Sequence, residues 1–362
     1  MKLSFFGAYD PDYPRNTVIR KGLRQNGVEV YECWLRPKYK FWMRYPLLFF
    51  RFLHFCSKRS FFFVPEFSQK DVPLAKFLSL LTSRKIIFDP LAPRYETKIT
   101  DWKRKRPDSW QARWNFAIDS WAFALSDLVL ADTQAHKDYY CREYGISSDK
   151  VEVLPVGYDE EVYRPDLVAE KGARFTVLFY GSFLPLHGAD AVVQAAKIVS
   201  KEDPSIEFKL IGSGQTFPHV RDLASELQLK NTQFEDWLPQ VELPQRIASA
   251  DICLGIFGET EKAGRVVPHK IYQSMGMKKP VITARTPAVE EFFSHRENVF
   301  LIPEPYPENL AQAILELKRE KDLRERIAEE AHQLVRQEYS PAAIGRALIR
   351  IIETKFLKSE KV

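Results

Sequence analysis

The stretch Phe175-Thr-Val-Leu-Phe-Tyr180-Gly181-Ser182-Phe-Leu-Pro-Leu-His187-Gly188 decides the fold of this chain. It begins with six residues typical of a buried strand, continues through a glycine turn, and leads into a helical pattern from about Ala189. Strand, turn and helix in this order predict a parallel βαβ unit. The turn would bring free backbone N–H groups and the positive end of a helix dipole to one point, which suits a phosphate.

A second glycine turn follows the next strand, which ends in Leu210-Ile211-Gly212-Ser213-Gly214. Parallel strands carry the turns that follow them to the same edge of a sheet, where ligands of open α/β sheets bind. Either turn alone is weak support for a site, because glycine often follows a strand. Together the two turns predict a site for a diphosphate and its nucleoside.

A third element is the run Arg265-Val-Val-Pro268-His-Lys270-Ile-Tyr-Gln273, which precedes the strand Val281–Thr283. Pro268 favours a helix start, so Lys270 would lie in the first turn of that helix. Lysine is unfavourable at the positive end of a helix, and a bound phosphate would explain its presence. Gln273 lies three residues later on the same face and is suited to bind a hydroxyl group, such as that of a ribose. The alternative is that both are ordinary solvent-facing residues.

Strands alternate with helical patterns along nearly the whole chain, which predicts an α/β protein with two Rossmann-like, doubly wound parallel sheets in tandem. The other expected strands are Leu3–Phe6, Val28–Cys33, Phe61–Val64, Lys85–Phe88, Leu128–Ala131, Val151–Leu154, Phe208–Ile211 and Ile252–Ile256. A polar, proline-containing segment from Asp159 to Arg174 is interpreted as the linker. We therefore expect domains over residues 1–165 and 166–340, followed by a helix over 341–362 that packs on the first domain.

Length and composition fit a two-domain globular protein, with 362 residues of which 45% are hydrophobic and 28% charged. The four cysteines are scattered without metal-type spacing and are expected to be reduced thiols. Met1 and Lys2 lead directly into an apolar strand, so we expect no signal peptide. No apolar run reaches the roughly 20 residues of a membrane-spanning helix. These features predict a cytoplasmic protein.

The chain resembles glycosyltransferase family 4, a group of retaining sugar transferases. Besides the elements above, the order and spacing of several further segments carry the resemblance: Val151-Glu-Val-Leu-Pro-Val-Gly157-Tyr-Asp159, Tyr163-Arg-Pro165, Ala250-Asp251, Pro287-Ala-Val-Glu-Glu291 and Asn298-Val-Phe-Leu-Ile302. The resemblance implies the GT-B architecture, in which two Rossmann-like domains face a central cleft. It also implies a nucleotide-sugar donor, with no metal and no cofactor.

The chain departs from the family at several donor positions. The family usually carries two glutamates seven residues apart, where this chain has Arg265 and Gln273. It also tends to place an arginine and a lysine around the first glycine turn, where this chain has Ser182 and His187. Compensating positive charge would come from Lys270, Lys262 or Arg15. The donor-binding residues that the resemblance implies are Gly181, Ser182, His187, Gly212, Ser213, Gly214, Lys262, Arg265, Lys270 and Gln273.

The first domain is expected to bind the acceptor. The loop after its first strand carries Tyr13, Arg15 and Asn16, which the resemblance places near the diphosphate or the acceptor. The same loop contains Asp10-Pro-Asp12, which we interpret as turn chemistry and not as a metal site.

Catalytic roles are expected for Asp89 and Lys270. Asp89 directly follows a strand, at about the position of a cleft-facing histidine or aspartate in relatives; a capping role in an Asp-Pro turn is the alternative. Lys270 would stabilise the departing nucleotide diphosphate. Glu96 and Asp101 are weaker candidates for the base, and Glu291 is expected to contact the sugar.

Net charge is +5, and the excess is uneven. No acidic residue occurs between Glu32 and Glu66, and residues 36–59 mix lysine and arginine with large aromatic side chains. One hypothesis is that this segment lies on an anionic membrane surface and guides a lipid-linked acceptor. The other is a buried helix with arginines that reach the surface. Nucleic acid is not expected, because no nucleic-acid module accompanies the basic segment.

The sequence therefore predicts a glycosyltransferase that moves a hexose-type sugar from a UDP- or GDP-linked donor to a glycan or lipid-linked acceptor, with retention, in polysaccharide or glycolipid synthesis. An epimerase or a phosphorylase-like enzyme fits less well. A catalytically silent GT-B protein, which binds a sugar nucleotide or acts as a scaffold, is the alternative from another class. The departures at Arg265, Gln273 and His187 keep that alternative open.

Overall fold

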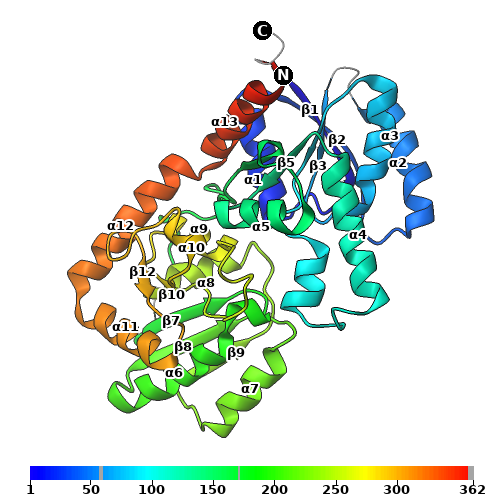
Figure 1. Ribbon diagram of the computed structural model, residues 1–362. Helices are drawn as coiled ribbons and strands as arrows, with labels where there is room; N and C mark the ends of the chain where they lie inside the picture. The colour runs from blue at the N-terminus through cyan, green and yellow to red at the C-terminus, as the bar shows by residue number, and fades with distance from the viewer. Residues whose placement is uncertain (57–59, 170–171, 358–362) are drawn as a thin grey trace. The chain divides into compact units, whose positions relative to one another are not determined.

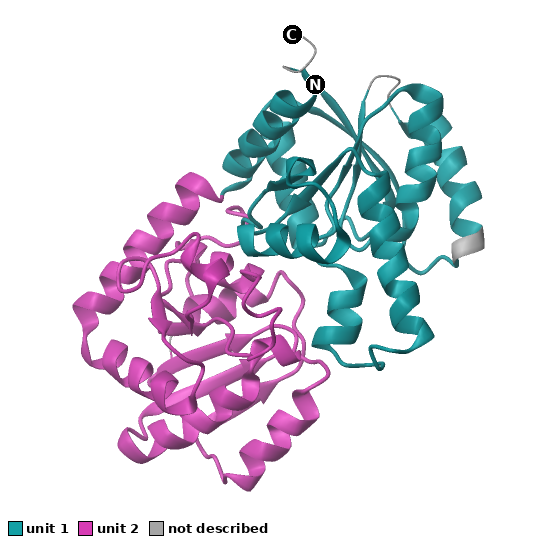
Figure 2. Cartoon of the chain, in the orientation of Figure 1, with its two compact units in different colours: residues 1–157, 340–362 teal, residues 158–339 magenta. Residues whose placement is uncertain are grey.

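A computed structural model of the chain describes residues 1–56, 60–169 and 172–357, with the side chains of all of these except Phe41 and Trp42. Lys58 and Arg59 of the predicted basic aromatic segment lie outside the described residues. The chain divides into two compact units (Figure 2). Unit 1 comprises residues 1–157 and 340–362, and unit 2 comprises residues 158–339.

Unit 1 is a six-stranded parallel sheet of order β2-β1-β3-β4-β5-β6 (Figure 1). Its strands are β1 (Lys2–Ala8), β2 (Glu29–Leu35), β3 (Phe61–Val64), β4 (Ile86–Phe88), β5 (Leu128–Ala131) and β6 (Val151–Val153). Its helices are α1 (Pro14–Gln25), α2 (Phe41–Phe55), α3 (Val72–Thr82), α4 (Trp110–Leu125), α5 (Gln134–Tyr144) and α13 (Pro341–Ile352). Short helical turns lie at Gln69–Asp71, Glu96–Asp101, Ser148–Lys150 and Glu353–Leu357.

The inner strands β3, β4 and β5 are apolar on both sides, as is usual for a parallel sheet that is covered on both faces. On one face Phe6, Phe62 and Phe88 join a core with side chains from α2, α3, α4 and α5. The alternate residues Phe5 and Phe63 are equally buried on the other face, the side on which α1 and α13 lie together. The predicted doubly wound sheet is confirmed.

Unit 2 is a second six-stranded parallel sheet, of order β12-β11-β10-β7-β8-β9. Its strands are β7 (Phe175–Tyr180), β8 (Ile206–Ile211), β9 (Thr232–Glu235), β10 (Ile252–Leu254), β11 (Val281–Ala284) and β12 (Phe300–Ile302). Its helices are α6 (Ala189–Glu202), α7 (Phe217–Glu226), α8 (Leu243–Ser249), α9 (His269–Gly276), α10 (Pro287–Glu290), α11 (Pro307–Arg319) and α12 (Lys321–Glu338), with a 3-10 turn at Pro185–His187. The edge strands β9 and β12 were not among the predicted strands.

The segment after residue 157 packs on unit 2, so unit 1 ends earlier than the predicted first domain, which extends to residue 165. The Tyr158 N–H donates to the Tyr339 carbonyl at 3.2 Å, where the chain leaves unit 2 again. The Tyr158 ring lies against Gly276, and the Tyr163 side chain is buried. The hydrogen bond and the two buried rings therefore place the crossing at residues 157–158 and 339–340.

Helix α13 returns to unit 1 and packs closely on α1. A β-carbon built on Gly22 would collide with the Pro341 carbonyl, and one built on Gly345 would collide with the Gly22 backbone. The two glycines therefore allow the helix backbones to touch. Among the described residues, we find no helix whose length and apolar character would let it span a bilayer.

We predict that Gly345→Ala lowers the stability of the protein, although alanine normally favours a helix. The added methyl group must displace the α1 backbone, which costs about 1–3 kcal/mol. Thermal unfolding measures the change. Gly172→Ala is the matched control, because the nearest heavy atom to its β-carbon would be 3.9 Å away. A melting temperature of Gly345→Ala equal to that of the control would contradict the close helix contact.

Candidate active site

The two predicted glycine turns lie against each other at the carboxyl edge of the unit 2 sheet. β7 and β8 are neighbours, with Tyr180 opposite Ile211 in the register. The Gly181 N–H donates to the Ile211 carbonyl at 2.9 Å. A β-carbon on Gly212 would lie 1.9 Å from the Gly181 carbonyl oxygen, and one on Gly214 would lie 2.6 Å from the Phe183 carbonyl oxygen, so both would collide with backbone. With φ values of 126° at Gly181 and 138° at Gly212, both turns depend on glycine.

Lys270 reaches into this edge from the first turn of α9. Its Nζ donates to the Gly255 carbonyl at 3.2 Å and lies 3.9 Å from the centre of the Phe179 ring. A β-carbon on Gly181 would be 3.8 Å from the same nitrogen. Lys270 is only 5% exposed, which excludes the solvent-facing alternative. Among the described residues, no carboxylate pairs with Lys270, and burial lowers its pKa to about 7.

His187 closes the first turn without adding charge. Its Nδ1 carries the hydrogen, because it donates to the Ser182 backbone carbonyl. Burial, together with the positive charges of Lys270 and Lys262, lowers the pKa of His187 well below its ordinary value. The imidazole is therefore neutral. His187 does not replace the positive charge that the family tends to place at this turn.

Gln273 is also buried, and Tyr180 fixes this part of α9. The Tyr180 hydroxyl donates to the Lys270 carbonyl at 2.9 Å and lies 3.4 Å from the Gln273 side-chain oxygen and 3.0 Å from the Ser274 hydroxyl. Gln273 is 5% exposed. The structure thus brings Gln273 together with Lys270 behind the glycine turns, as their spacing predicted.

The remaining predicted residues of unit 2 lie around this group. Lys262 is buried, whereas Arg265 forms an ion pair with Glu261 at 3.2 Å. Glu291 is exposed just after α10. Ser182 is half-buried and Ser213 is exposed on the two turns. These contacts leave the donor roles of Lys262, Arg265, Ser182, Ser213 and Glu291 as predictions.

In unit 1 the structure brings Arg15 and Asp89 together. The Arg15 Nε donates to Asp89 at 2.6 Å, and its two terminal nitrogens donate to the carbonyls of Leu154 and Pro155 at 3.1 and 3.2 Å. Both side chains are fully buried. Burial raises the pKa of Asp89, and the positive charge of Arg15 opposes that rise. This arrangement favours a structural role for Asp89 over a catalytic one. It also occupies the Arg15 guanidinium with hydrogen-bond partners in unit 1.

The neighbouring loop residues are also engaged within unit 1. The Asn16 amide donates to the Asp10 carbonyl and to Glu66, each at 2.7 Å. The Tyr13 ring packs edge-on against Phe67. The Asp12 N–H donates to the Asp10 carboxylate at 3.0 Å, which is the turn chemistry expected of this segment.

A buried histidine between two carboxylates was not predicted from the sequence. The two ring nitrogens of His136 lie 2.6 Å from Asp132 and 3.0 Å from Glu96. Burial alone would lower the pKa of His136, but the two carboxylates outweigh it and raise the pKa to about 9. Asp132 directly follows β5, and Thr133 caps α5. A carboxylate at a strand end just before a helix is the sequence feature that could have indicated this cluster. Of His136 and its two carboxylate partners, only Glu96 is a candidate from the sequence, as a weaker choice for the base.

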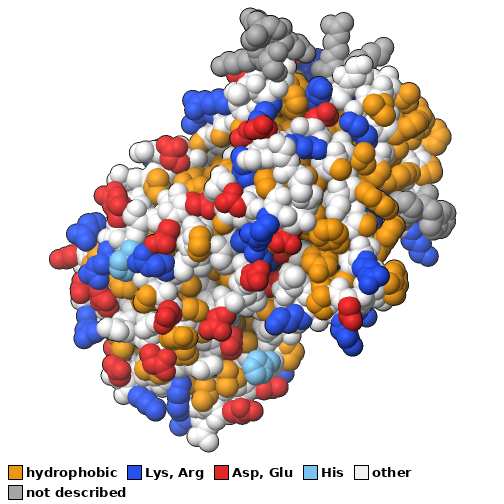
Figure 3. All heavy atoms as spheres, in the orientation of Figure 1, with side chains coloured by type: hydrophobic (Ala, Val, Ile, Leu, Met, Phe, Trp, Pro, Cys, Tyr) orange, Lys and Arg blue, Asp and Glu red, His pale blue; other side chains and the backbone are white. Residues whose placement is uncertain are grey.

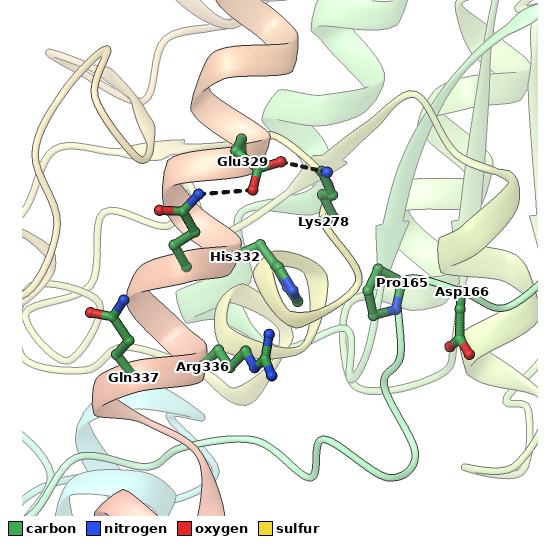
Figure 4. A pocket seen from close by; sticks show the side chains of 8 residues that line it. Pro165, Asp166, Lys278, Glu329, His332, Arg336 and Gln337 are labelled. Carbon is green, nitrogen blue, oxygen red and sulfur yellow. Dashed lines mark hydrogen bonds and ion pairs between the residues drawn. The ribbon is translucent and has the colours of Figure 1, made fainter.

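A separate pocket of unit 2 lies beside α12, lined by Pro165, Asp166, Lys278, Glu329, His332, Gln333, Arg336 and Gln337 (Figure 4). Its charges are largely satisfied internally. Glu329 pairs with Lys278 and accepts from Gln333, and His332 bonds to the Gly276 carbonyl at 3.0 Å. None of the predicted donor residues lines this pocket.

Comparison with known proteins agrees with this fold. The family model described as glycosyl transferases group 1 matches residues 162–334. A D-inositol 3-phosphate glycosyltransferase of Thermomonospora curvata is 25% identical over 62% of this chain and 56% of that protein. The putative colanic acid biosynthesis glycosyltransferase WcaL of Salmonella typhimurium is 20% identical over 59% of this chain and 53% of WcaL. This chain therefore spans about half the length of the curated relatives it matches.

Among solved structures, HepE of Anabaena in complex with UDP-glucose superposes with a TM-score of 0.72. The match has 17% identity and covers 99% of this chain and 100% of HepE. At that identity the likeness establishes the fold, which is GT-B. Residues 162–334, just under half of this chain, match the glycosyl transferases group 1 model, and these curated relatives are named glycosyltransferases.

We predict that Asp89→Asn destabilises the protein by about 3–5 kcal/mol, because it leaves the buried Arg15 charge without its partner. Denaturant unfolding measures the loss. The double variant Arg15→Met with Asp89→Leu should recover most of it, because a buried ion pair can be replaced by apolar groups at little cost. An Asp89→Asn protein of normal stability that has lost only transferase activity would instead support the catalytic role.

Proposed function

We propose that the protein transfers a hexose-type sugar from a UDP- or GDP-linked donor to a glycan or lipid-linked acceptor, with retention of configuration. The observation that carries the proposal is the buried Lys270, which has no carboxylate partner among the described residues, at the edge where two glycine turns meet. A buried charge is costly unless it is paired. The diphosphate of a nucleotide sugar would supply the missing negative charge.

The proposed chemistry follows from where charge develops. As the glycosidic bond to the diphosphate breaks, negative charge grows on the leaving oxygen. Lys270 would stabilise that charge together with N–H groups of the two turns other than those of Gly181 and Gly212, which donate to the Ile211 and Glu235 carbonyls. With retention, a leaving phosphate oxygen itself would help to remove the proton of the acceptor hydroxyl on the same face. This scheme needs no base from Asp89, consistent with the burial of that residue against Arg15.

UDP-linked donors are the first to test, because HepE was crystallised with UDP-glucose. GDP-linked donors are the second choice. WcaL is named for colanic acid biosynthesis, which supports a role for this protein in cell-surface polysaccharide or glycolipid synthesis. We propose a cytoplasmic protein that meets an anionic membrane surface through residues 36–59, where a lipid-linked acceptor would be reached.

A catalytically silent sugar-nucleotide-binding protein is the second candidate. The observation in its favour is that Arg265, at a position where the family usually has glutamate, pairs with Glu261 and cannot accept a hydrogen bond from a sugar. Assays of donor hydrolysis and sugar transfer separate the candidates. Donor binding without turnover would favour the silent protein.

We predict that Lys270→Met weakens UDP binding about tenfold to a hundredfold, because it removes a charged hydrogen-bond donor to the diphosphate. The same change should leave the ligand-free protein as stable or more stable, since it removes an unpaired buried charge. Calorimetric titration with UDP and thermal unfolding measure the two effects. Lys278→Met, at an exposed lysine paired with Glu329, is the control. Unchanged UDP affinity in Lys270→Met would refute the proposed diphosphate site.

We predict that the UDP affinity of the protein falls as the pH rises above about 7. With a pKa of about 7, Lys270 loses its proton over that range, and binding of the diphosphate must then restore it. The slope is at most about tenfold per pH unit, which corresponds to one proton. Above pH 7 the phosphate, with a second pKa of about 6, stays fully ionised. Lys270→Met should show a flat profile, and equal slopes in both proteins would contradict the role of Lys270.

A further inference from the structure

The outer sides of α2, α3 and α4 in unit 1 form one apolar surface, which we call the three-helix face. Of the eighteen exposed large hydrophobic side chains among the described residues, eleven lie on these helices. They include Leu80, 72% exposed, Trp110, 70% exposed, and Phe50, 60% exposed. The full set is Met43, Leu47, Phe50, Leu53, Phe55, Phe77, Leu80, Leu81, Trp110, Trp114 and Trp121.

The fold of unit 1 does not account for this surface. The same helices already present other apolar residues to the sheet, including the fully buried Leu48, Leu78 and Ala122. A helix of a water-soluble domain normally has an apolar stripe on one side and polar residues on the other. Here both sides are apolar, and only the inner side is covered. The hypothesis that α2 is a buried helix therefore holds only for the side of α2 that faces the sheet.

The three helices are neighbours, so the exposed side chains belong to one surface. The Arg84 guanidinium, just after α3, lies 5.0 Å from the centre of the Phe52 ring of α2, and α3 in turn packs on α4. Trp114 and Trp121 of α4 contact each other edge-on at 5.7 Å. Figure 3 shows hydrophobic side chains gathered over this part of unit 1.

The exposed charges around the three-helix face are predominantly positive. Within the described parts of residues 36–84 and 103–125, Asp108 is the only exposed carboxylate, and it pairs with Arg106. The other acidic residues there, Glu66, Asp71 and Asp119, are buried. Exposed basic residues are Arg36, Lys38, Lys40, Lys103, Arg104, Lys105, Arg106 and Arg113. The surface therefore fits an anionic partner with an apolar interior.

We propose that the three-helix face docks on an anionic lipid bilayer, with its leucine, phenylalanine and tryptophan side chains inserted among the lipids and its basic residues against the headgroups. A second copy of the chain fits poorly, because a two-fold contact through this face would bring basic residues against basic residues. The docking surface thus extends beyond residues 36–59 to α3 and α4. Docking of this face on a bilayer does not depend on the proposed function. Only its role, which is access to a lipid-linked acceptor, rests on that function.

The topology supports that purpose. A helix between parallel strands runs opposite to them, so α4 begins at the carboxyl edge of the unit 1 sheet. Trp110 is the first residue of α4, and the cluster Lys103–Arg106 precedes it. The carboxyl edge is also where Tyr13 and Asn16 lie, in the loop and helix start after β1. Docking through Trp110 would place the predicted acceptor region near the headgroups.

Flotation of the full chain with vesicles tests the proposal. Vesicles of phosphatidylcholine with phosphatidylglycerol should bind the protein, vesicles of phosphatidylcholine alone should bind it less, and added salt should weaken binding. The variants Leu80→Ser with Leu81→Ser on α3, and Trp110→Ser with Trp114→Ser on α4, should each reduce vesicle binding at least about tenfold. Trp237→Ser in unit 2, where Trp237 is 57% exposed, should leave vesicle binding unchanged.

The thermal shift produced by UDP in the same variants distinguishes this proposal from the proposed function. Variants that lose vesicle binding but keep the UDP shift remain folded and support docking through α3 and α4. Unchanged vesicle binding in both double variants would overturn the three-helix face, whatever the result with UDP. A change in oligomeric state without a change in vesicle binding would overturn it as well, in favour of a contact between copies.

Discussion

The proposed donor site of this protein depends on one buried positive charge. Lys270 lies against the Phe179 ring and the Gly255 carbonyl, almost without exposure and without a carboxylate partner among the described residues. Such a group is unfavourable in the ligand-free protein, and its pKa falls to about 7 as a result. A site that holds a cation in this way is prepared to gain free energy from an anion, because most of the cost of desolvating the lysine has already been met in folding.

The rest of unit 2 serves to place that charge. The glycines let β7 and β8 deliver their turns to one point, since a side chain at Gly212 or Gly214 would collide with the neighbouring backbone. The Tyr180 hydroxyl holds α9 through the Lys270 carbonyl and Ser274. His187 is neutral, so it adds hydrogen-bonding capacity but no second positive charge beside Lys270. The charge pattern thus differs from the one typical of the family, as the departures at Ser182 and His187 in the sequence indicated.

The sequence was sufficient where local pattern decides the structure. Strands β3, β5 and β7 have the predicted bounds, and α9 begins next to Pro268, because apolar runs, glycine and proline act locally. Strand β9 was missed because its polar sequence Thr-Gln-Phe-Glu lies at a sheet edge. The pairing of Arg15 with Asp89 and the position of His136 between Asp132 and Glu96 were not predictable, since each joins residues far apart in the chain. Burial, which decides whether Asp89 is available as a base, likewise appears only in the folded structure.

Crystal structures of the protein grown with and without a UDP-sugar would show whether Lys270 binds the diphosphate. Without ligand, we expect no carboxylate near the Lys270 Nζ. With ligand, diphosphate oxygens should lie within hydrogen-bond distance of that nitrogen and of the turns at Gly181 and Gly214. A carboxylate side chain against Lys270 in the ligand-free crystal, or a nucleotide bound with its phosphates elsewhere, would contradict the proposed diphosphate site.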